Sequence, residues 1–379
     1  MDALMLPLNW QRVRLGDIGK PCMCKRVMKH QTTRYGEIPF YKIGTFGNTA
    51  DAFISKKLFL EYKTKYSFPK KGDILISASG TIGRAVIYDG KPAYFQDSNI
   101  VWIDNDETLV KNDFLFYAYS NVKWNTEHTT ILRLYNDNFR NTLIPLPPLN
   151  EQSTIANILS ALDRYLCALD TLILKKEGVK KSLSFELLSQ RKRLKGFNQD
   201  WQRVRLGDIA NYLTSNLSVE QITQQGKIKV YDVNNFIGYT DTTFISDKPY
   251  ISIVKDGSVG RVRILPPKTN ILSTMGALIA NHRTTTEFLF YLLSNFDFKN
   301  FTSGSIIPHI YFKDYKEKTI FLPPLNEQIA IANILSGLDN EITSLKNKKR
   351  QFENIKKALN HDLMSAKIRV LEKSVLQQK

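Results

Sequence analysis

The chain carries the same sequence twice, and this internal repeat limits its possible folds more than any other feature. The nine residues Trp10–Ile18 recur letter for letter as Trp201–Ile209. Further matches follow in the same order in both halves, and the seven residues Leu146–Gln152 return as Leu322–Gln328. Identity over this length does not arise by chance, and it indicates one structural unit used more than once. We therefore expect two domains of the same fold.

The middle parts of the two copies differ, while the segments around them agree. Phe53–Ser55 matches Phe244–Ser246 at an offset of 191 residues, whereas Gly80–Arg84 resembles Gly257–Arg261 at an offset of 177. The second copy therefore lacks 14 residues between these two points. A single scaffold that carries two different specificities would show this pattern, and so would divergence without functional consequence.

Each copy ends in a long amphipathic segment that begins after a Pro-Pro pair. The apolar residues of the first segment alternate in steps of four and three, which is the spacing of a coiled-coil seam. The predicted seam of the first copy consists of Ile155, Leu159, Leu162, Leu166, Leu169, Ile173, Leu183 and Leu187. The predicted seam of the second copy consists of Leu335, Leu338, Ile342, Leu345, Phe352, Ile355, Leu359 and Leu363.

We expect a helix of about 45 residues in each copy, or roughly 65 to 70 Å at 1.5 Å per residue. Asn150 is placed to cap the start of the first helix, and Gly196 is placed just beyond its end. A helix this long with one apolar stripe needs a partner, and the nearest stripe of equal length is in the same chain. We expect the helices to pair antiparallel, with the domains at opposite ends and related by an approximate two-fold axis. The alternative is that each helix packs on its own domain.

Short segments rich in β-branched and aromatic residues predict strands in the first globular part. They are Ile38–Ile43, Asp73–Ser77, Ala85–Tyr88 and Asn99–Ile103. Phe114–Ser120 is expected to be helical. The expected fold is therefore α+β, with two domains separated by an antiparallel coiled coil. The expected boundaries are residues 1–145 and 197–321 for the domains, and residues 146–196 and 322–379 for the helical parts.

The composition points to a polyanionic partner. The 379 residues include 53 Lys and Arg against 36 Asp and Glu, which gives a net charge of +17 and a pI near 9.5. No window has the roughly 20 apolar residues of a spanning helix, and the N-terminus lacks an export signal, so we expect a cytoplasmic protein. Cys22, Cys24 and Cys167 are too few for a disulfide framework. No further ligands complete a metal site, so free thiols are expected.

Three loops in each copy are candidate DNA-binding segments, because they combine Gly with side chains that form hydrogen bonds. One follows an early strand, one contains Gly80–Arg84 or Gly257–Arg261, and one is Thr129–Arg133 or its counterpart Ser305–His309. For the second loop, a turn without function is the alternative. A nucleotide-binding loop is excluded there, because neither a Gly-Lys-Ser/Thr ending nor a following helix is present. The candidate DNA-binding residues are Lys42, Thr45, Asn48, Ser77, Ser79, Thr81, Arg84, Arg133, Asn234, Asn235, Lys255, Ser258, Arg261, Arg263 and His309.

The sequence contains no recognisable catalytic constellation. The five His residues are scattered, no Gly-x-Ser-x-Gly elbow is present, and no carboxylate cluster is paired with Lys as in nucleases. A binding protein is therefore favoured over an enzyme. The Lys and Arg residues of the long segments could form a solvated face, contact acidic partner proteins or contact the DNA backbone. A basic interaction scaffold with non-specific DNA binding is the alternative function.

The doubled sequence resembles the specificity subunits of type I restriction-modification enzymes. The resemblance rests on the Trp-x-x-Val-x-Leu-Gly-Asp-Ile opening of each half and on the Leu-Pro-Pro-Leu-Asn-Glu-Gln entry into each long segment. It also rests on Gly72–Ser77, which precedes a Ser-Gly-Thr-Ile-Gly turn. The resemblance covers essentially the whole chain. The second copy departs from the family pattern at Ile251–Lys255, which lacks the Gly-Asp lead.

The resemblance implies two target-recognition domains that bind the two halves of a gapped, asymmetric site in double-stranded DNA. It also implies a non-catalytic subunit that has no cofactor of its own. Two modification subunits would carry S-adenosylmethionine and methylate adenine. Restriction subunits would use ATP and Mg to translocate and cleave the DNA.

Overall fold

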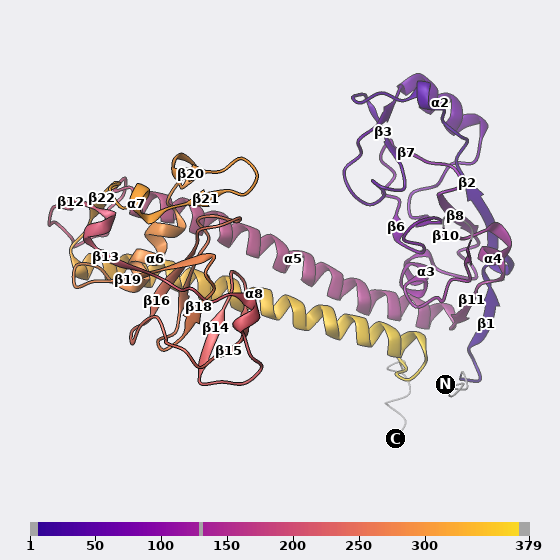
Figure 1. Cartoon of the computed structure of the whole chain (residues 1–379). Coiled ribbons are helices and arrows are strands. Elements are labelled where there is room, and N and C mark those ends of the chain that lie inside the picture. The colour runs from indigo at the N-terminus through magenta and orange to yellow at the C-terminus, as the bar shows by residue number, and fades with distance from the viewer. Residues whose placement is uncertain (1–6, 129–131, 371–379) are drawn as a thin grey trace. The chain divides into compact units, whose positions relative to one another are not determined.

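The computed structural model describes residues 7–128 and 132–370, which form two compact units (Figure 1). Unit 1 comprises residues 1–168 and 349–379, and unit 2 comprises residues 169–348. Each unit holds one globular part and a portion of both long helices, α5 (Leu149–Leu188) and α8 (Leu325–Met364). The predicted α+β fold with an internal repeat is confirmed.

Unit 1 is built around a four-stranded antiparallel sheet in the order β2-β8-β5-β6. Its strands are β2 (Gly19–Met23), β8 (Ile100–Asn105), β5 (Ile74–Ser77) and β6 (Ala85–Ile87). The smaller sheets contain β4 (Phe53–Ile54), β3 (Ile38–Tyr41) and β7 (Tyr94–Phe95), then β1 (Gln11–Arg14) with β11 (Leu143–Leu146), and β9 (Glu127–His128) with β10 (Leu132–Arg133). The helices are α1 (Leu15–Ile18), η1 (Lys29–Gln31), α2 (Lys56–Lys65), α3 (Asn112–Tyr119) and α4 (Asn136–Asn141). The predicted strands and helix fall on β3, β5, β6, β8 and α3.

Unit 2 repeats this arrangement, with a four-stranded sheet in the order β13-β19-β16-β17. Its strands are β13 (Ala210–Thr214), β19 (Met275–Ala280), β16 (Tyr250–Val254) and β17 (Val262–Leu265). The smaller sheets contain β15 (Phe236–Thr240), β14 (Ile228–Tyr231) and β18 (Asn270–Ile271), then β12 (Gln202–Arg205) with β22 (Thr319–Leu322), and β20 (Thr302–Ser303) with β21 (His309–Ile310). The helices are η2 (Leu206–Asp208), η3 (Val219–Gln221), α6 (Thr286–Ser294), η4 (Lys299–Phe301) and α7 (Phe312–Tyr315).

The length difference between the two copies has a structural explanation. Helix α2 of unit 1 lies between Ser55 and Gly80, which is where the second copy is shorter. Residues 169–348 of unit 2 are all described, and they contain no helix between β15 and β16. The four-stranded sheet therefore survives the deletion, and only a peripheral helix is lost.

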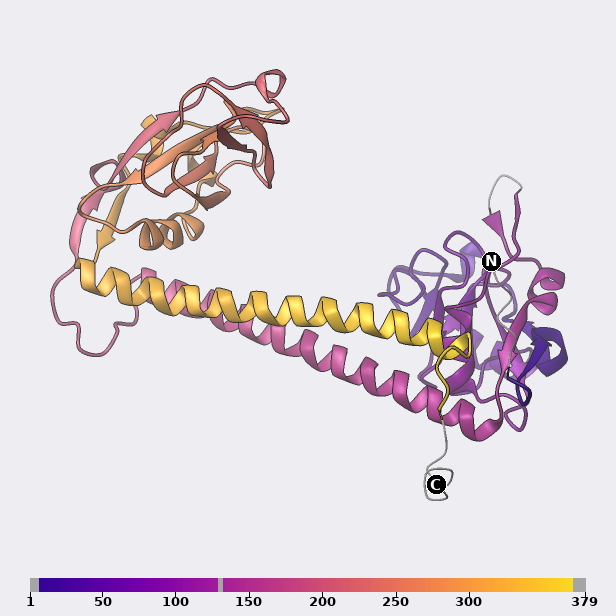
Figure 2. The same ribbon diagram turned by 90° about the horizontal axis from the view of Figure 1, so that it is seen from below.

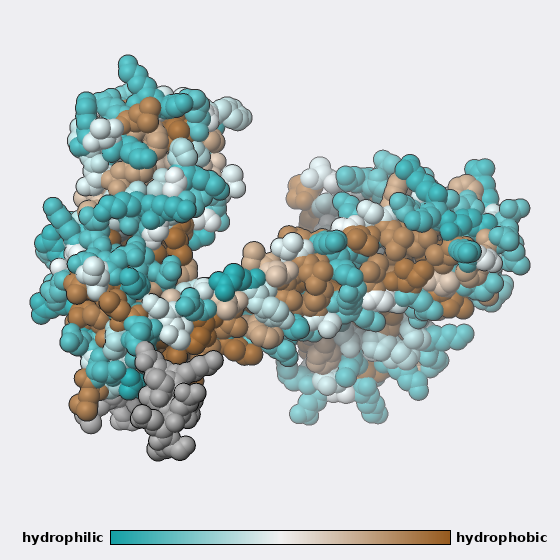
Figure 3. Space-filling view, turned by 180° about the vertical axis from the view of Figure 1, so that it is seen from behind, coloured by the Kyte–Doolittle hydropathy of each residue, from teal (hydrophilic) through white to brown (hydrophobic). Residues whose placement is uncertain are grey.

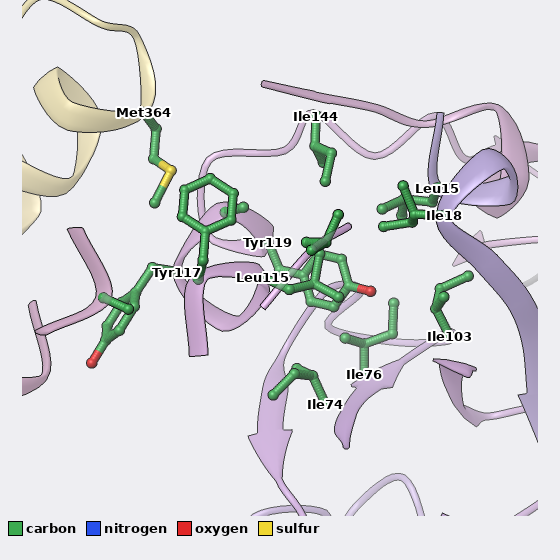
Figure 4. Close-up of a cluster of buried hydrophobic side chains, with 14 of the residues drawn as sticks. Leu15, Ile18, Ile74, Ile76, Ile103, Leu115, Tyr117, Tyr119, Ile144 and Met364 are labelled. Atoms are coloured by element: carbon green, nitrogen blue, oxygen red, sulfur yellow. The ribbon is translucent and has the colours of Figure 1, made fainter. Parts of the chain in front are cut away.

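The core of unit 1 lies between its four-stranded sheet and α3 (Figure 4). Ile76 of β5 packs in this cluster with Leu115 and Tyr119 of α3. Met364, at the end of α8, belongs to the same cluster, and Leu187, near the end of α5, belongs to the main core of unit 2. Each core is therefore completed by the end of a long helix, because a small sheet with one helix leaves apolar surface to cover.

The two long helices pair antiparallel inside each unit, as the magenta and yellow ribbons of Figure 2 show. In unit 2 the Nζ atom of Lys176 lies 2.8 Å from Oε1 of Glu341. One turn further along α5, Nζ of Lys180 lies 2.5 Å from Oδ1 of Asp339. The residue numbers rise along one helix as they fall along the other. The predicted antiparallel pairing is confirmed.

The seam in unit 1 departs from the predicted apolar pattern at one position. The rings of Tyr165 and Phe352 meet there with centroids 4.7 Å apart. The prediction that Ile355 belongs to the seam is wrong, because its side chain is 50% exposed. A step of four from Phe352 leads instead to Lys356, which forms an ion pair with Asp163 of α5. An ion pair thus continues the seam where the apolar spacing alone shows a gap.

These ion pairs give part of the helices' basic charge a role that the sequence analysis did not foresee. Four Lys residues expected on a solvated or partner-binding face pair with carboxylates of the other helix. They are Lys176, Lys180, Lys346 and Lys356. Ion pairs at a surface contribute only about 0.2 to 1 kcal/mol each. Their main effect is to fix the register of the two helices, because sliding one helix past the other would separate all four ion pairs.

The long helices differ from the prediction at their ends. Each has 40 residues, which corresponds to about 60 Å and is shorter than expected. Helix α5 begins at Leu149, so Asn150 lies inside its first turn, where its Oδ1 accepts a hydrogen bond from the backbone N–H of Glu151 at 2.9 Å. The helix ends at Leu188, and Gly196 lies further along the chain with a φ of +94°.

The repeated Leu-Pro-Pro-Leu-Asn-Glu-Gln segment anchors each long helix to its globular part. In unit 2 the buried Gln328 donates from Nε2 to the carbonyl oxygen of Arg283 at 2.9 Å and accepts at Oε1 from the hydroxyl of Thr284 at 2.8 Å. Beside it, Oε2 of Glu327 accepts from Nε1 of Trp201 at 3.0 Å. The Trp that opens a copy thus meets the Glu that begins its helix. Because buried polar groups need partners, both motifs have a structural reason to occur in each copy.

A tyrosine from each globular part also binds a long helix. The hydroxyl of Tyr117 donates to Asp163 at 2.7 Å, and the hydroxyl of Tyr291 donates to Asp339 at 2.9 Å. Burial raises the pKa of both tyrosines above the ordinary value, and the neighbouring carboxylates raise it further. Both hydroxyls therefore stay protonated and remain donors in neutral solution.

Residues 7–128 and 132–370 contain neither a membrane-spanning helix nor a cluster of metal-binding side chains. No helix in these ranges is long and apolar enough to cross a bilayer, and no group of three or more His, Cys, Asp or Glu is placed to hold a metal ion. Cys22 and Cys24 are free thiols. Burial raises the pKa of Cys24 to about 12, so this thiol is protonated and unreactive.

Candidate nucleic-acid interface

In each unit an isolated β-bridge joins two of the candidate loops. In unit 1 the bridge links Ser79, after β5, to Arg133 on β10. In unit 2 it links Asp256, after β16, to His309 on β21. We name the two residues joined in each unit the bridge pair. The two bridge pairs occupy the same place in the repeated fold but carry different side chains.

An arginine connects the first candidate loop, which follows the early strand, to the other two. In unit 2, Nη2 of Arg261 donates to Oδ1 of Asn234 at 3.0 Å. In unit 1 the corresponding contact runs from Nη2 of Arg84 to Oδ1 of Asn48, at 3.5 Å. All three candidate loops of a unit therefore converge on one surface, which the sequence alone could not establish.

The loop after β5 is shaped by two buried serines. Ser77 donates to the carbonyl oxygen of Thr81 and accepts from the backbone N–H of Arg84 at 2.9 Å. Ser79 donates to Oδ1 of Asn99 at 2.8 Å. Both serines are at most 5% exposed, whereas Thr81 and Arg84 point outward. The serines fix the form of the loop, and the exposed residues are available to a ligand.

A glycine with positive φ closes this loop in both units. Gly83 has a φ of +82°, and a Cβ there would lie 2.1 Å from Nε1 of Trp124. Gly260 has a φ of +80°, and a Cβ there would lie 2.5 Å from the ring of Phe298. Only glycine fits both the conformation and the space. The loop of unit 2 therefore has the same form, although its sequence lacks the Gly-Asp lead, and Ser258 is exposed on it.

Turns hold the first candidate loop, which follows the early strand, in place. In unit 1, Oγ1 of Thr45 accepts from the backbone N–H of Lys42 at 3.1 Å, and Nζ of Lys42 lies 2.8 Å from Oδ1 of Asp51. In unit 2, Oδ1 of Asp232 accepts from the backbone N–H of Asn234 at 2.7 Å and from that of Asn235 at 2.6 Å. Both asparagines are exposed. Asp232 thus orders a loop that presents two amide side chains.

The two surfaces also differ in shape. In unit 2 the guanidinium of Arg263 lies 5.2 Å from the ring centroid of Tyr231 and donates from Nη1 to the carbonyl oxygen of Asn234 at 2.9 Å. Unit 1 has Val86 at the position of Arg263 by the offset of 177. A cavity of about 410 Å³, lined among others by Val86 and Tyr41, lies there. The same scaffold therefore offers a cation in one unit and a hollow in the other.

The bridge pair of unit 2 contains a residue that the sequence analysis missed. Nδ1 of His309 lies 2.6 Å from Oδ1 of Asp256, and both side chains are about one-third exposed, at 36% and 30%. His309 was predicted from the sequence, but Asp256 was not, although it stands beside the predicted Lys255. A carboxylate next to a Gly-Ser turn carries no signal of its partner, which lies 53 residues away. Of the third loop in unit 1, Thr129, Thr130 and Ile131 lie outside the described residues.

Both copies of the repeat match one protein family. The family model described as the type I restriction modification DNA specificity domain matches residues 7–177 and again residues 198–354. The chain is 26% identical to the type I restriction enzyme MjaVIII specificity subunit of Methanocaldococcus jannaschii, over 98% of this chain and 95% of that protein. A Haemophilus influenzae protein with the provisional name of a type I restriction enzyme specificity subunit is 64% identical over 148 residues, which span 39% of this chain and 38% of that protein.

The fold is also similar to a solved structure of the same kind. The S subunit of the type I restriction-modification system of M. genitalium matches with a TM-score of 0.62 and 20% identity, over 95% of this chain and 98% of that one. This likeness concerns the fold. The repeated architecture and the family match over both copies lead to one conclusion: the chain belongs to the type I restriction modification DNA specificity domain family.

Proposed function

We propose that the chain is the sequence-specific DNA-recognition subunit of a cytoplasmic type I restriction-modification complex. Each unit binds one half of a two-part, gapped site in double-stranded DNA. One observation carries this proposal: three loops converge at the same place in both units, but their side chains differ. A protein that binds two different DNA sequences needs this combination, because backbone contacts position the protein while side chains at base edges specify the sequence.

The proposed division of labour leaves the chemistry to other subunits. The chain directs adenine methylation by two modification subunits that carry S-adenosylmethionine, and DNA cleavage by restriction subunits that use ATP and Mg. A recognition subunit needs no catalytic group of its own. The relatives named above are specificity subunits, which supports this role.

An exposed apolar face on α5 is a suitable surface for one of these partners. In unit 2, Leu174 is 68% exposed and Phe185 is 52% exposed. They stand 11 residues apart, which is about three helical turns, so they lie on one side of the helix, with the exposed Lys181 between them. Figure 3 shows apolar surface of this kind among the polar residues. Exposed apolar patches commonly mark protein interfaces, and we propose that a modification subunit binds this one.

The proposed DNA contacts are made by exposed or half-exposed side chains of the converging loops. Arginine and lysine suit phosphates and guanine, and amide side chains suit adenine. In unit 1 these residues are Lys42, Thr45, Asn48, Thr81, Arg84 and Arg133. In unit 2 they are Asn234, Asn235, Lys255, Ser258, Arg261, Arg263 and His309. The buried Ser77 and Ser79 contribute through the form of their loop.

The proposal is tested by mapping methylated adenines in the DNA of a host that expresses this chain with its modification and restriction partners. We expect one motif with two short specific parts separated by a fixed number of unspecified base pairs. A host that expresses the partners alone should lack this motif. Methylation without sequence preference would contradict the proposal and favour the basic scaffold.

Replacing Arg261 with alanine is expected to weaken DNA binding by the assembled complex about tenfold, because an exposed cation in the interface is lost. If Arg261 contacts a phosphate, DNA binding should depend less steeply on salt: the plot of log binding constant against log salt concentration should lose about one unit of its negative slope. The measurement is a titration of target DNA at several salt concentrations. Arg205→Ala is the matched control, because this arginine is exposed in the same unit, outside the loops, and pairs with Glu317. Equal effects of both substitutions would contradict the assigned interface.

A further inference from the structure

The bridge pair of unit 2 holds its imidazole in a defined orientation. An ionised carboxylate only accepts hydrogen bonds, so the contact of 2.6 Å between Nδ1 of His309 and Oδ1 of Asp256 requires the hydrogen to be on Nδ1. The ring is also confined on its other edge. A Cβ at Gly304 would lie 3.0 Å from Cδ2 of His309, so the hairpin backbone stands close to that edge. Tyr311 stacks on the ring with centroids 6.5 Å apart.

This arrangement decides what the remaining ring nitrogen can do. When one nitrogen of a neutral imidazole carries the hydrogen, the other is an acceptor. In the neutral ring, the hydrogen on Nδ1 leaves a free lone pair on Nε2, and the side chain is 36% exposed. In the major groove, the hydrogen-bond donors are the N6 amino group of adenine and the N4 amino group of cytosine. Guanine and thymine present only acceptors there, which would repel a second lone pair.

We propose that Asp256 fixes His309 as a hydrogen-bond acceptor that selects an amino-bearing base, adenine or cytosine, in the DNA half-site bound by unit 2. The inference rests on the proposed function and assigns a specificity-determining pair to it. Asp256 acts as a positioning residue, and His309 contacts the base. The neighbouring cations Arg261 and Arg263 lie on the same surface and are suited to the phosphates around that base.

The bridge pair of unit 1 has the opposite chemistry at the same place in the fold. Arg133 carries only donors, and Ser79 turns its hydroxyl to Asn99. Arginine suits the N7 and O6 acceptors of guanine. One scaffold position thus presents an acceptor in unit 2 and donors in unit 1. This difference gives the two units a physical basis for preferring different bases.

The test uses the complex of the full chain with its modification subunit and synthetic duplexes of the methylated motif. In each duplex one major-groove group is removed: purine replaces adenine, 2-pyrimidinone replaces cytosine, or 7-deazaguanine replaces guanine. Binding is measured for the native chain and for His309→Ala. We expect one amino deletion in one half-site to weaken native binding about tenfold and to have no further effect in His309→Ala, because the contact is already lost.

Asp256→Asn is the second variant, and it keeps the size of the side chain. An amide can donate to Nδ1 as well as accept from it, so both imidazole tautomers become available. The loss of affinity that the amino deletion causes through His309 should therefore shrink from about tenfold to about threefold or less. Deletions in the other half-site serve as the internal control and should affect native and variant complexes equally.

Three results would overturn the inference while leaving the proposed function intact. Coupling of His309 to the N7 of guanine would mean that the imidazole acts as a donor. A uniform loss of affinity in His309→Ala, without coupling to any base, would mean a phosphate contact. Unchanged coupling in Asp256→Asn would mean that the carboxylate does not set the tautomer. If the native complex shows no sequence preference at all, the proposed function itself fails.

Discussion

Replacing Glu327 with alanine is expected to lower the free energy of unfolding of unit 2 by about 3 kcal/mol. Glu327 is fully buried at the start of α8. Its carboxylate accepts from Nε1 of Trp201 at 3.0 Å and from Nη2 of Arg193 at 2.7 Å, with a second contact from Nε of Arg193 at 3.2 Å. The substitution leaves the indole N–H of Trp201 without its acceptor and leaves a void beside that ring. It also removes the carboxylate partner of Arg193, whose Nη2 keeps only the carbonyl oxygen of Gln199, at 2.7 Å. Urea unfolding followed by tryptophan fluorescence measures the loss.

Glu151 provides the matched comparison in unit 1. It accepts from Trp10 at 3.0 Å, but Arg369 donates to it through a single nitrogen, Nη2, at 3.3 Å. Glu151→Ala should therefore destabilise the protein less than Glu327→Ala. Glu327→Gln retains one acceptor oxygen and the size of the side chain, so it should cost less than Glu327→Ala as well. A loss below about 1 kcal/mol for Glu327→Ala would show that the buried carboxylate does not hold the helix to its domain.

Exchanging residues 20–140 for the equivalent segment of another family member is expected to replace one half of the recognised DNA site and to leave the other half unchanged. The exchanged segment contains all three candidate loops of unit 1. It leaves in place β1 and β11, which pair through Val13 and Ile144, and the Trp10 contact to Glu151. The graft thus keeps the Trp10 contact to the long helix, while the incoming segment must supply the contacts that Lys111 makes to Gln152 and Tyr117 makes to Asp163. Mapping methylated adenines in the host DNA measures the outcome.

The control for this exchange is the equivalent graft of residues 211–316 in unit 2. It should change the opposite half of the site. If either graft altered both halves, the two units would not bind DNA independently. If neither graft altered the motif, the converging loops would not be the DNA-binding surface.

Much of the architecture was predictable because it depends on residues close together in the chain. The nine-residue identity at Trp10–Ile18 indicated a doubled fold, and a four-three apolar spacing indicated paired helices. Alternating β-branched segments located β5 and β8 within two residues. Local spacing failed at Ile355, where Lys356 holds the seam position instead. A hydrophobic pattern cannot represent a position that is occupied by an ion pair.

The candidate site was predictable only as separate pieces. Gly and polar residues marked three loops in each copy, since turn chemistry is local. Nothing in the sequence joined Asp256 to His309, or Asn234 to Arg261, because these pairs are 53 and 27 residues apart. Ser77 and Ser79 also looked like exposed loop residues, whereas their hydroxyls are buried within the loop.

The sequence by itself determined that this protein has two copies of one fold, two long helices and loops rich in hydrogen-bonding groups. Only the tertiary structure decided which loops meet, which lysines lie between the helices and which carboxylate orients the histidine. The physical reason is the range of the interactions. Helix and strand periodicity is set by neighbours along the chain, whereas contacts between distant residues depend on the path of the whole backbone through the core.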